Sequence, residues 1–237
     1  MPGSVKFFDP VDPFSLADWE VQTGPNPNRT KQRASALKSD GDELAHAQHG
    51  TSESCTFTYV AKKFTGFLTV PGVGTIASGY HIDNWTVTYS QRGFPALSVS
   101  AHKHIDGTLD ASCRIYEPTF KVPARTIGIP TEIPAVTGDD PVFALDAEAV
   151  VGIRGMTLAM SLNHVDEDDN AGNHLAGDNY DGSETITVDF TGDVVPADDY
   201  ELAEDWTDDT LGKSQGNTQA TTTSLTATHH VAHKVAA

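Results

Sequence analysis

The sequence predicts a mainly β protein: an antiparallel β-sandwich or barrel with long loops, an extended N-terminal arm and one or two short helices. Three observations support this prediction. Apolar and polar residues alternate with a period of two in several segments after residue 54. Valine, isoleucine, threonine and aromatic residues dominate these segments, and prolines and glycines separate them. Half-buried strands of this kind must cover one another, which favours a two-layered or closed sheet.

Residues 1–54 are expected to form the arm, and residues 55–237 the β-sandwich domain. Prolines at positions 2, 10, 13, 25 and 27 exclude a continuous helix or a central strand in the arm. The arm nevertheless carries large apolar side chains, which must be buried against the domain or against a neighbouring subunit. We expect the following to be oligomer contacts: Phe7, Phe8, Phe14 and Trp19.

The expected strands follow one another along the domain. Alternation of apolar and polar residues marks segments 55–59, 67–70, 85–89, 97–101, 156–164 and 186–190, and a threonine-rich strand is expected over 221–235. Helix is indicated only weakly, at 142–151 and 197–206, where apolar residues could share one helical face. The two cysteines, Cys55 and Cys113, lie in strand-like apolar contexts and are expected to be buried free thiols.

The acidic residues are concentrated in the second half of the chain. The formal net charge is −18, but residues 1–138 hold 13 acidic and 12 basic residues, whereas residues 139–237 hold 20 acidic and 3 basic ones. This balance argues against a protein that grips nucleic acid, because phosphate binding needs clustered lysine and arginine. An electronegative surface is expected at Asp166, Asp168, Asp169, Asp178, Asp181, Glu184, Asp189 and Asp193.

Three interpretations of this charge stay open. The acids could form an ordinary solvated surface, a face of an assembly that must not hold nucleic acid, or an adaptation to high salt. The excess of aspartate over glutamate, 23 against 10, fits the halophilic interpretation. That interpretation explains the composition and leaves the uneven distribution along the chain unexplained.

A long acidic loop is predicted over residues 165–183, between two strands. Connections of this length are uncommon unless they bind something or contact another chain. We therefore expect oligomer contacts from Asp168, Asp169, Asn170 and His174. No apolar run is long enough for a membrane-spanning helix, and the first residues lack the apolar stretch of a secretory signal, so no membrane partner is expected.

Metal-binding patterns are present but incomplete. Asp166, Asp168 and Asn170 match the first three ligand positions of an EF-hand loop, yet Ala171 and Gly177 stand where glycine and glutamate are required. His102 and His104 lie two residues apart on an expected strand, so they would point to the same face. These five ligand-type residues are weak candidates, and the overall expectation is no metal and no cofactor.

No catalytic motif stands out. The chain has no G-x-S-x-G elbow, no H-E-x-x-H helix and no phosphate-binding loop, and its carboxylates are too many for any one pair to be diagnostic. The prediction is therefore that the protein is not an enzyme.

The chain resembles virion structural proteins of tailed viruses. The resemblance is carried by SALKSDGDELA, a TFTYV strand, HIDNWTVTYSQRGFPALSVSAHKH, LNHVDEDDNAGNHLAGDNYDGSETITVDFTG and the threonine-rich C-terminal strand, in that order. It spans about residues 33–234 and is similar most of all to the tail tube protein of long-tailed phages and archaeal viruses.

The resemblance implies a β-sandwich of the tail-tube type in the viral tail. Subunits of that family form stacked rings, which would be hexamers or trimers here, contact other tail proteins and enclose a channel for genome ejection. An electronegative wall would let DNA pass without binding. Two alternatives stay open: a capsid decoration, turret or baseplate protein, and a metal- or glycan-binding β-sandwich module.

Overall fold

The computed structural model describes the following residues: 12–23, 27–64, 66–104, 118–128, 136–137, 140–141, 143–145, 150–168, 174–192, 200–202, 206–214 and 221–232. Within them the chain forms strands and no helix, so the prediction of a mainly β protein is confirmed. The described residues contain no helix that could cross a membrane.

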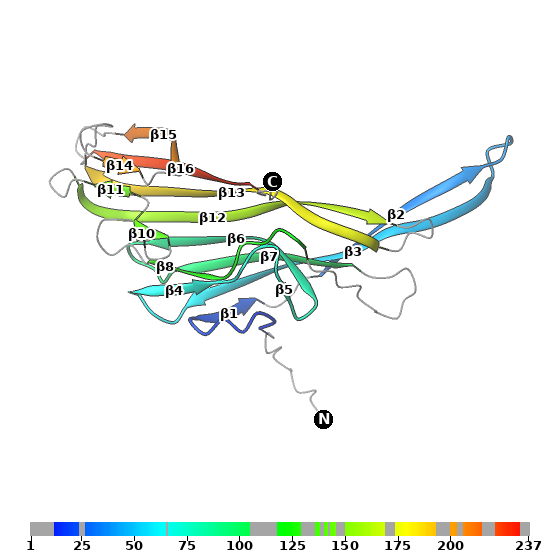
Figure 1. Ribbon diagram of the computed structural model, residues 1–237, viewed down its shortest axis with the longest axis horizontal. Coiled ribbons are helices and arrows are strands. Elements are labelled where there is room, and N and C mark those ends of the chain that lie inside the picture. Colours follow the sequence, from blue (N-terminus) through cyan, green and yellow to red (C-terminus); the bar gives the residue numbers. More distant parts are fainter. Residues whose placement is uncertain are drawn as a thin grey trace, which may run out of the picture.

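Ten strands form one large antiparallel sheet (Figure 1). Its main path runs in the order β1-β3-β7-β6-β12-β13-β16-β15. Off this path, β2 pairs with β3, and β5 pairs with β6. The strands are β1 (Trp19–Thr23), β2 (Asn28–Leu37), β3 (Glu43–Ala61), β5 (Ile76–Ala77), β6 (Tyr80–Ser90), β7 (Ala96–His104), β12 (Val150–Asp168), β13 (His174–Gly192), β15 (Trp206–Ser214) and β16 (Thr222–Ala232).

Two smaller sheets accompany it. One has four strands in the order β10-β9-β8-β4, and the other pairs β11 with β14. Their bounds are β4 (Phe67–Val70), β8 (Arg125–Gly128), β9 (Val136–Thr137), β10 (Asp140–Pro141), β11 (Phe143–Leu145) and β14 (Tyr200–Leu202).

The hydrophobic core lies on one face of the large sheet. Each long strand contributes alternate residues to it, such as Phe57, Val99 and Leu158, because successive side chains of a strand point to opposite faces. Residues from outside the long strands complete the core, among them Leu68 of β4 and Ile127 of β8.

The opposite face of the large sheet is lined mainly by hydroxyl side chains. Seven residues lie directly across from one another on successive strands, and we call this row the hydroxyl face: Thr58, Ser98, Thr86, Ala159, Thr185, Thr228 and Thr207. The row contains no charged residue, although the chain as a whole carries a net charge of −18. Neighbouring hydroxyls also bond across strands, as between Thr187 and Thr226 at 3.0 Å.

The hairpin formed by β2 and β3 extends beyond the sheet (Figure 1). Gln32–Leu37 pairs with Glu43–His49, and in the described structure no third strand lies beside this part. β3 then continues into the sheet, where Ser52–Val60 pairs with β7. A single strand of 19 residues therefore belongs to both the projecting hairpin and the core.

Three sequence-based expectations need correction. The helices expected at 142–151 and 197–206 are wrong where the structure describes these residues, because β11 and β14 pair with each other there. The acidic loop expected over 165–183 is shorter, because β12 continues to Asp168 and β13 begins at His174. The N-terminal arm contains β1, β2 and the first half of β3, so the expected division after residue 54 falls inside a strand.

Candidate functional site

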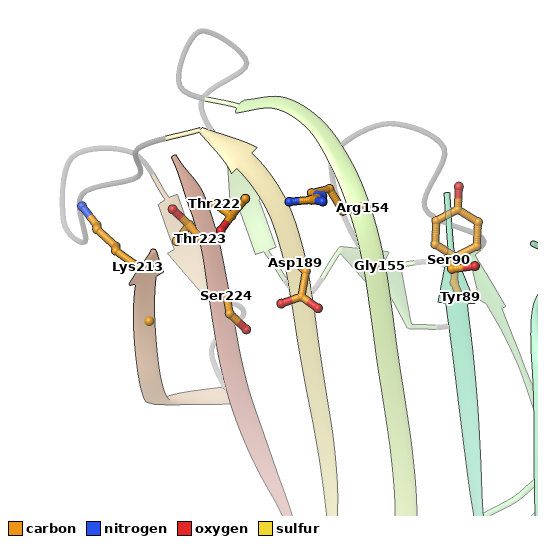
Figure 2. A pocket seen from close by; sticks show the side chains of 10 residues that line it. Tyr89, Ser90, Arg154, Gly155, Asp189, Lys213, Thr222, Thr223 and Ser224 are labelled. Carbon is orange, nitrogen blue, oxygen red and sulfur yellow. The ribbon is translucent and has the colours of Figure 1, made fainter. Parts of the chain in front are cut away.

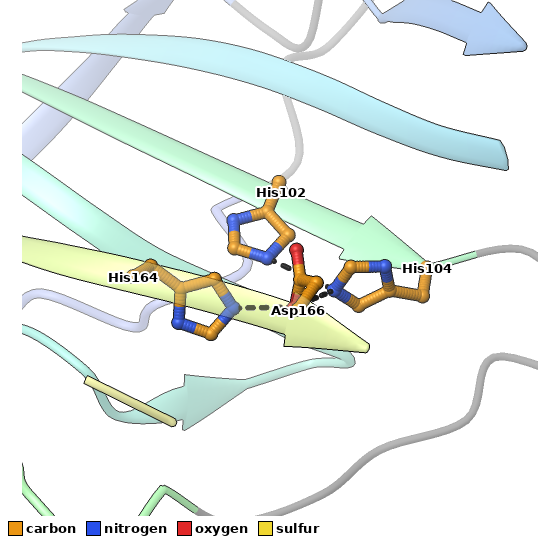
Figure 3. A group of neighbouring side chains, drawn as sticks. All are labelled: His102, His104, His164 and Asp166. Atoms are coloured by element: carbon orange, nitrogen blue, oxygen red, sulfur yellow. Dashed lines mark hydrogen bonds and ion pairs between the residues drawn. The ribbon is translucent and has the colours of Figure 1, made fainter. Parts of the chain in front are cut away.

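Three histidines and an aspartate meet where β7 and β12 end. His102 and His104 close β7, and His164 and Asp166 lie near the end of β12 (Figure 3). In each strand the two residues are two positions apart, the spacing that places side chains on the same face. One ligand-type atom from each of the four residues lies within 4.8 Å of those from the other three. We call this group the histidine cluster.

The cluster is tight and centred on one carboxylate oxygen. Asp166 Oδ1 is 2.7 Å from His164 Nε2 and 3.3 Å from His104 Nε2. His104 Nε2 is 3.2 Å from His102 Nε2. The three imidazoles are largely buried, whereas Asp166 is partly exposed, so the group is open to solvent on the side of the carboxylate.

Two β-bulges lie beside the cluster. In β6, Ile82 and Asn84 pair with consecutive residues of β7, which leaves Asp83 as the extra residue. In β13, the partners of Asn163 and His164 are Asp181 and Asn179, which leaves Tyr180 as the extra residue. A bulge redirects the side chains beside it, and these two place a carboxylate and an amide against the cluster histidines.

Those two polar groups hold the outer nitrogens of two imidazoles. His102 Nδ1 lies 2.5 Å from Asp83 Oδ1, and His164 Nδ1 lies 3.0 Å from Asn179 Oδ1. Asn179 is oriented in turn, because its amide nitrogen donates to the carbonyl oxygen of Phe120 at 2.8 Å. With their Nδ1 nitrogens bonded outward, both imidazoles direct Nε2 into the cluster.

Close packing behind Asn179 requires a glycine. Gly74 has a φ of 74°, and a Cβ atom at this position would lie 2.4 Å from the amide nitrogen of Asn179. Any other residue would suffer both the unfavourable left-handed conformation and this clash. Gly74 therefore keeps Asn179 within reach of His164.

The cluster changes the pKa values of two of its members and of the adjacent His81. Burial, reinforced by the neighbouring histidines, lowers the pKa of His81 to about 3, and its ring stacks on His102 with centroids 5.2 Å apart. Burial acts to raise the pKa of Asp166, but hydrogen bonds from His104 and His164 outweigh it, and the pKa lies well below its usual range. Burial acts to lower the pKa of His164, but the bond to Asp166 raises it overall.

The predicted electronegative surface is only partly one surface. Asp181 and Asp189 are exposed, whereas Asp178 accepts backbone N–H groups of Thr119 and Phe120. Glu184 is a correction: it is 1% exposed and forms an ion pair with Arg125, so it cannot belong to a surface. The structure does not describe Asp169, Asn170 and Asp193, nor the side chains of Asp168 and His174.

The expected oligomer contacts from the arm also change. Trp19 is 1% exposed, and its indole N–H donates to the carbonyl oxygen of Thr69 at 2.6 Å. Phe14 packs edge-on against Phe57 with ring centroids 5.0 Å apart. Both side chains therefore pack against the core of their own subunit, which corrects the expectation that they are oligomer contacts. Phe7 and Phe8 lie outside the described residues.

An open hollow of about 700 Å³ lies at one end of the large sheet (Figure 2). Arg154 of β12 and Lys213 of β15 line it, with Asp189 of β13 between them. These cations are two of the three basic residues in the acidic half of the chain. Both are exposed, so the hollow is a charged depression of the surface and not an enclosed ligand cavity.

Sequence reasoning found part of the histidine cluster and missed the rest. It named His102, His104 and Asp166, which the structure brings together, but it grouped Asp166 with Asp168 and Asn170. It missed His164 and the flanking His81, Asp83 and Asn179. The available signal was His164, which stands two residues before Asp166 at a strand end, as His102 stands before His104.

No family model matches the chain, and no curated protein matches it. The function is therefore inferred from the chain's own geometry.

Proposed function

We propose that the chain is a structural protein of a viral tail, a tail tube subunit that assembles with copies of itself into stacked rings around a channel for the genome. The observation that carries the proposal is the projecting β2–β3 hairpin. Over Gln32–Leu37 and Glu43–His49 its two strands have no third strand beside them in the described structure.

A two-stranded hairpin that leaves its sheet is marginally stable in water. Its outer backbone N–H and C=O groups are available for pairing with another strand, which is how neighbouring chains extend a sheet. Leu37 lies at the end of β2 and is 63% exposed. A second copy of the chain would cover this leucine and pair with the hairpin, as the resemblance to tail tube proteins implies.

The hydroxyl face supports the same proposal. A channel for DNA should offer no lysine or arginine grip on phosphate, so that the genome slides. The row from Thr58 to Thr207 has no cation, and the exposed acids on its side of β13 are Asp181 and Asp189. In a ring, the hydroxyl rows of adjacent subunits would together form an uncharged stretch of wall, and Arg154 and Lys213 would lie beside Asp189 in the hollow at its end.

The proposal is tested by electron microscopy of the purified protein, which should form hollow tubes. A variant in which residues 33–48 are replaced by Asn-Gly joins Gln32 to His49 through a two-residue turn. This variant should keep the β-rich circular dichroism spectrum and cooperative unfolding of the full chain, and it should no longer form tubes.

The outcomes separate the alternatives. Tubes formed equally well by the shortened variant would contradict the role of the hairpin. Discrete trimers of the full chain, with no tubes under any salt condition, would overturn the tube and favour a capsid decoration, turret or baseplate protein. The control for the shortened hairpin is the double variant Thr187→Val and Thr226→Val. It keeps the strand shape and the hairpin, so it should form tubes as the unchanged chain does.

A further inference from the structure

We propose that His102, His104, His164 and Asp166 bind one divalent transition-metal ion, with zinc as the best fit, in a structural site that fastens the end of β7 to the end of β12. This inference concerns the isolated subunit and does not depend on the proposed tail tube.

The arrangement of the donor atoms fits a tetrahedral ion. Ligand atoms about 2.0–2.1 Å from zinc are separated by roughly 3.4 Å along the edges of a tetrahedron. Three separations in the cluster are close to that edge: 3.2 Å between the Nε2 atoms of His102 and His104, 3.3 Å from His104 Nε2 to Asp166 Oδ1, and 2.7 Å from His164 Nε2 to the same oxygen. The other three separations are at most 4.8 Å, so the four side chains would have to shift to hold the ion at the centre.

The outer partners are those that metal-binding histidines usually have. A ligating imidazole commonly donates its second N–H to a carboxylate or a carbonyl oxygen, which fixes the tautomer and the ring orientation. His102 has Asp83 in this role, and His164 has the amide oxygen of Asn179. In the resulting neutral tautomers, the Nε2 lone pairs of both histidines point into the cluster.

The number and type of ligands indicate a structural ion. Four protein ligands complete a tetrahedral site and leave no position for a substrate, whereas catalytic zinc sites keep one open. Imidazole and carboxylate donors suit zinc, and also nickel, copper and cobalt. Calcium and magnesium are disfavoured because they prefer oxygen ligands.

The position of the site in the sheet indicates what a bound ion would stabilise. β7 and β12 are not neighbours, since β6 lies between them, and the pairing of β6 with β12 stops at Asn84 and Ser161. Beyond that point the ion would join the two strands where no β6–β12 backbone ladder continues. His104 also pairs with Ser52 of β3, at the base of the projecting hairpin. The metal would therefore strengthen the part of the sheet from which the hairpin leaves.

The test is a titration of the full-length protein, freed of metal by a chelator, with Zn²⁺ and separately with Co²⁺. We expect one equivalent of Zn²⁺ to bind and to raise the unfolding temperature. Co²⁺ should give the intense visible absorption of a tetrahedral site, and Zn²⁺ should displace it. Weak octahedral absorption, or no stoichiometric binding of either ion, would overturn the proposal without any variant.

Substitutions then locate the site. His104→Ala and His164→Ala should each weaken Zn²⁺ binding by more than the roughly 10–100-fold that loss of an outer-shell partner costs, and Asp83→Asn should fall within that range. His230→Ala is the matched control, because His230 is an exposed histidine of β16 outside the cluster, and it should bind as the unchanged chain does. Equal affinities for His164→Ala and His230→Ala would contradict the assignment.

Discussion

At Glu53 a buried carboxylate pairs with the partly buried Lys103 and the exposed Arg29. Glu53 is 3% exposed, and its oxygens lie 2.8 Å from Lys103 Nζ and 2.6 Å from Arg29 Nε. The hydroxyl of Tyr80 donates to the same carboxylate at 3.3 Å. Burial acts to raise the pKa of Glu53, but the bonds from Lys103 and Arg29 outweigh it, and the pKa lies below its usual value.

Replacing this carboxylate should be costly. Glu53→Gln leaves Lys103 partly buried without a counter-charge, and we expect a loss of about 3 kcal/mol in the free energy of unfolding, measured with urea at pH 7. Because the folded pKa is lowered, the stabilisation is complete above the ordinary value of 4.5 and is lost as the pH falls through the folded pKa. The difference between the variant and the unchanged chain should therefore shrink in acid.

The control for Glu53 is an exposed ion pair. Glu20 is 65% exposed and lies 3.6 Å from Lys62, which is 50% exposed. Glu20→Gln should change the free energy of unfolding by less than about 1 kcal/mol. If the two variants lose equal stability, burial does not set the strength of the Glu53 ion pairs.

Gly74 and Gly79 form a matched pair of positions. Both have positive φ, 74° and 81°, but an added Cβ meets Asn179 only at Gly74 and nothing within 4 Å at Gly79. Gly79→Ala should cost about 1 kcal/mol, the conformational penalty alone. Gly74→Ala should cost at least about 1 kcal/mol more in urea unfolding, because Asn179 must move. Equal costs would mean that Asn179 yields freely.

At the scale of elements, the bulge in β13 sets which side chain faces His164. Tyr180 is the extra residue, and it is 56% exposed. Without it, the strand would pair regularly with β12, and residues before the bulge would point to the opposite face. It is therefore the bulge in the backbone, and not the side chain of Tyr180, that positions Asn179.

Deleting Tyr180 should separate this positioning from stability. We expect the deletion to break the bond between His164 and Asn179 and to weaken Zn²⁺ binding at least tenfold, as loss of an outer partner does. Tyr180→Ala keeps the bulge and should bind Zn²⁺ normally. Isothermal titration calorimetry measures both, and unchanged affinity in the deletion variant would show that the bulge does not control the site.

Long strands with one buried face could be predicted from the sequence. Very short strands, and strand ends that are polar on both faces, could not. The alternation from Trp85 to Tyr89 survives because one side of β6 faces the core. β11 and β14 have three residues each, too few to display a period, and only their pairing with each other defines them. The ends of β12 and β13 are polar on both faces, so they resemble a loop in sequence even though their backbones pair.

The site was predictable only within single strands. The spacing of His102 and His104 predicted that both side chains lie on one face of a strand. Their partners on β12, however, lie about sixty residues later in the chain. Their meeting depends on the order of strands and on bulges at Asp83 and Tyr180, and neither follows from local sequence.

At the scale of the whole molecule, the charge of −18 should make stability depend on salt. Screening shortens the reach of repulsion from about 10 Å at 0.1 M to about 3 Å at 1 M ionic strength. We expect the urea midpoint to rise with sodium chloride over this range. The double variant Glu167→Gln and Asp181→Asn removes two exposed acids, and its urea midpoint should rise less. A urea midpoint independent of salt would argue against self-repulsion and against an adaptation of the surface to high salt.

The continuity of β3 has a mechanical consequence. A pull on the tip of the hairpin, directed along the strand, reaches the core without crossing a flexible joint. It would load the pairs from Ser52 to Val60 against β7 in shear, so that they resist together and do not open one after another. The same strand carries Phe57 and Tyr59, two of the largest buried side chains. In the proposed assembly, tension between neighbouring subunits would thus be carried into the buried core of each one.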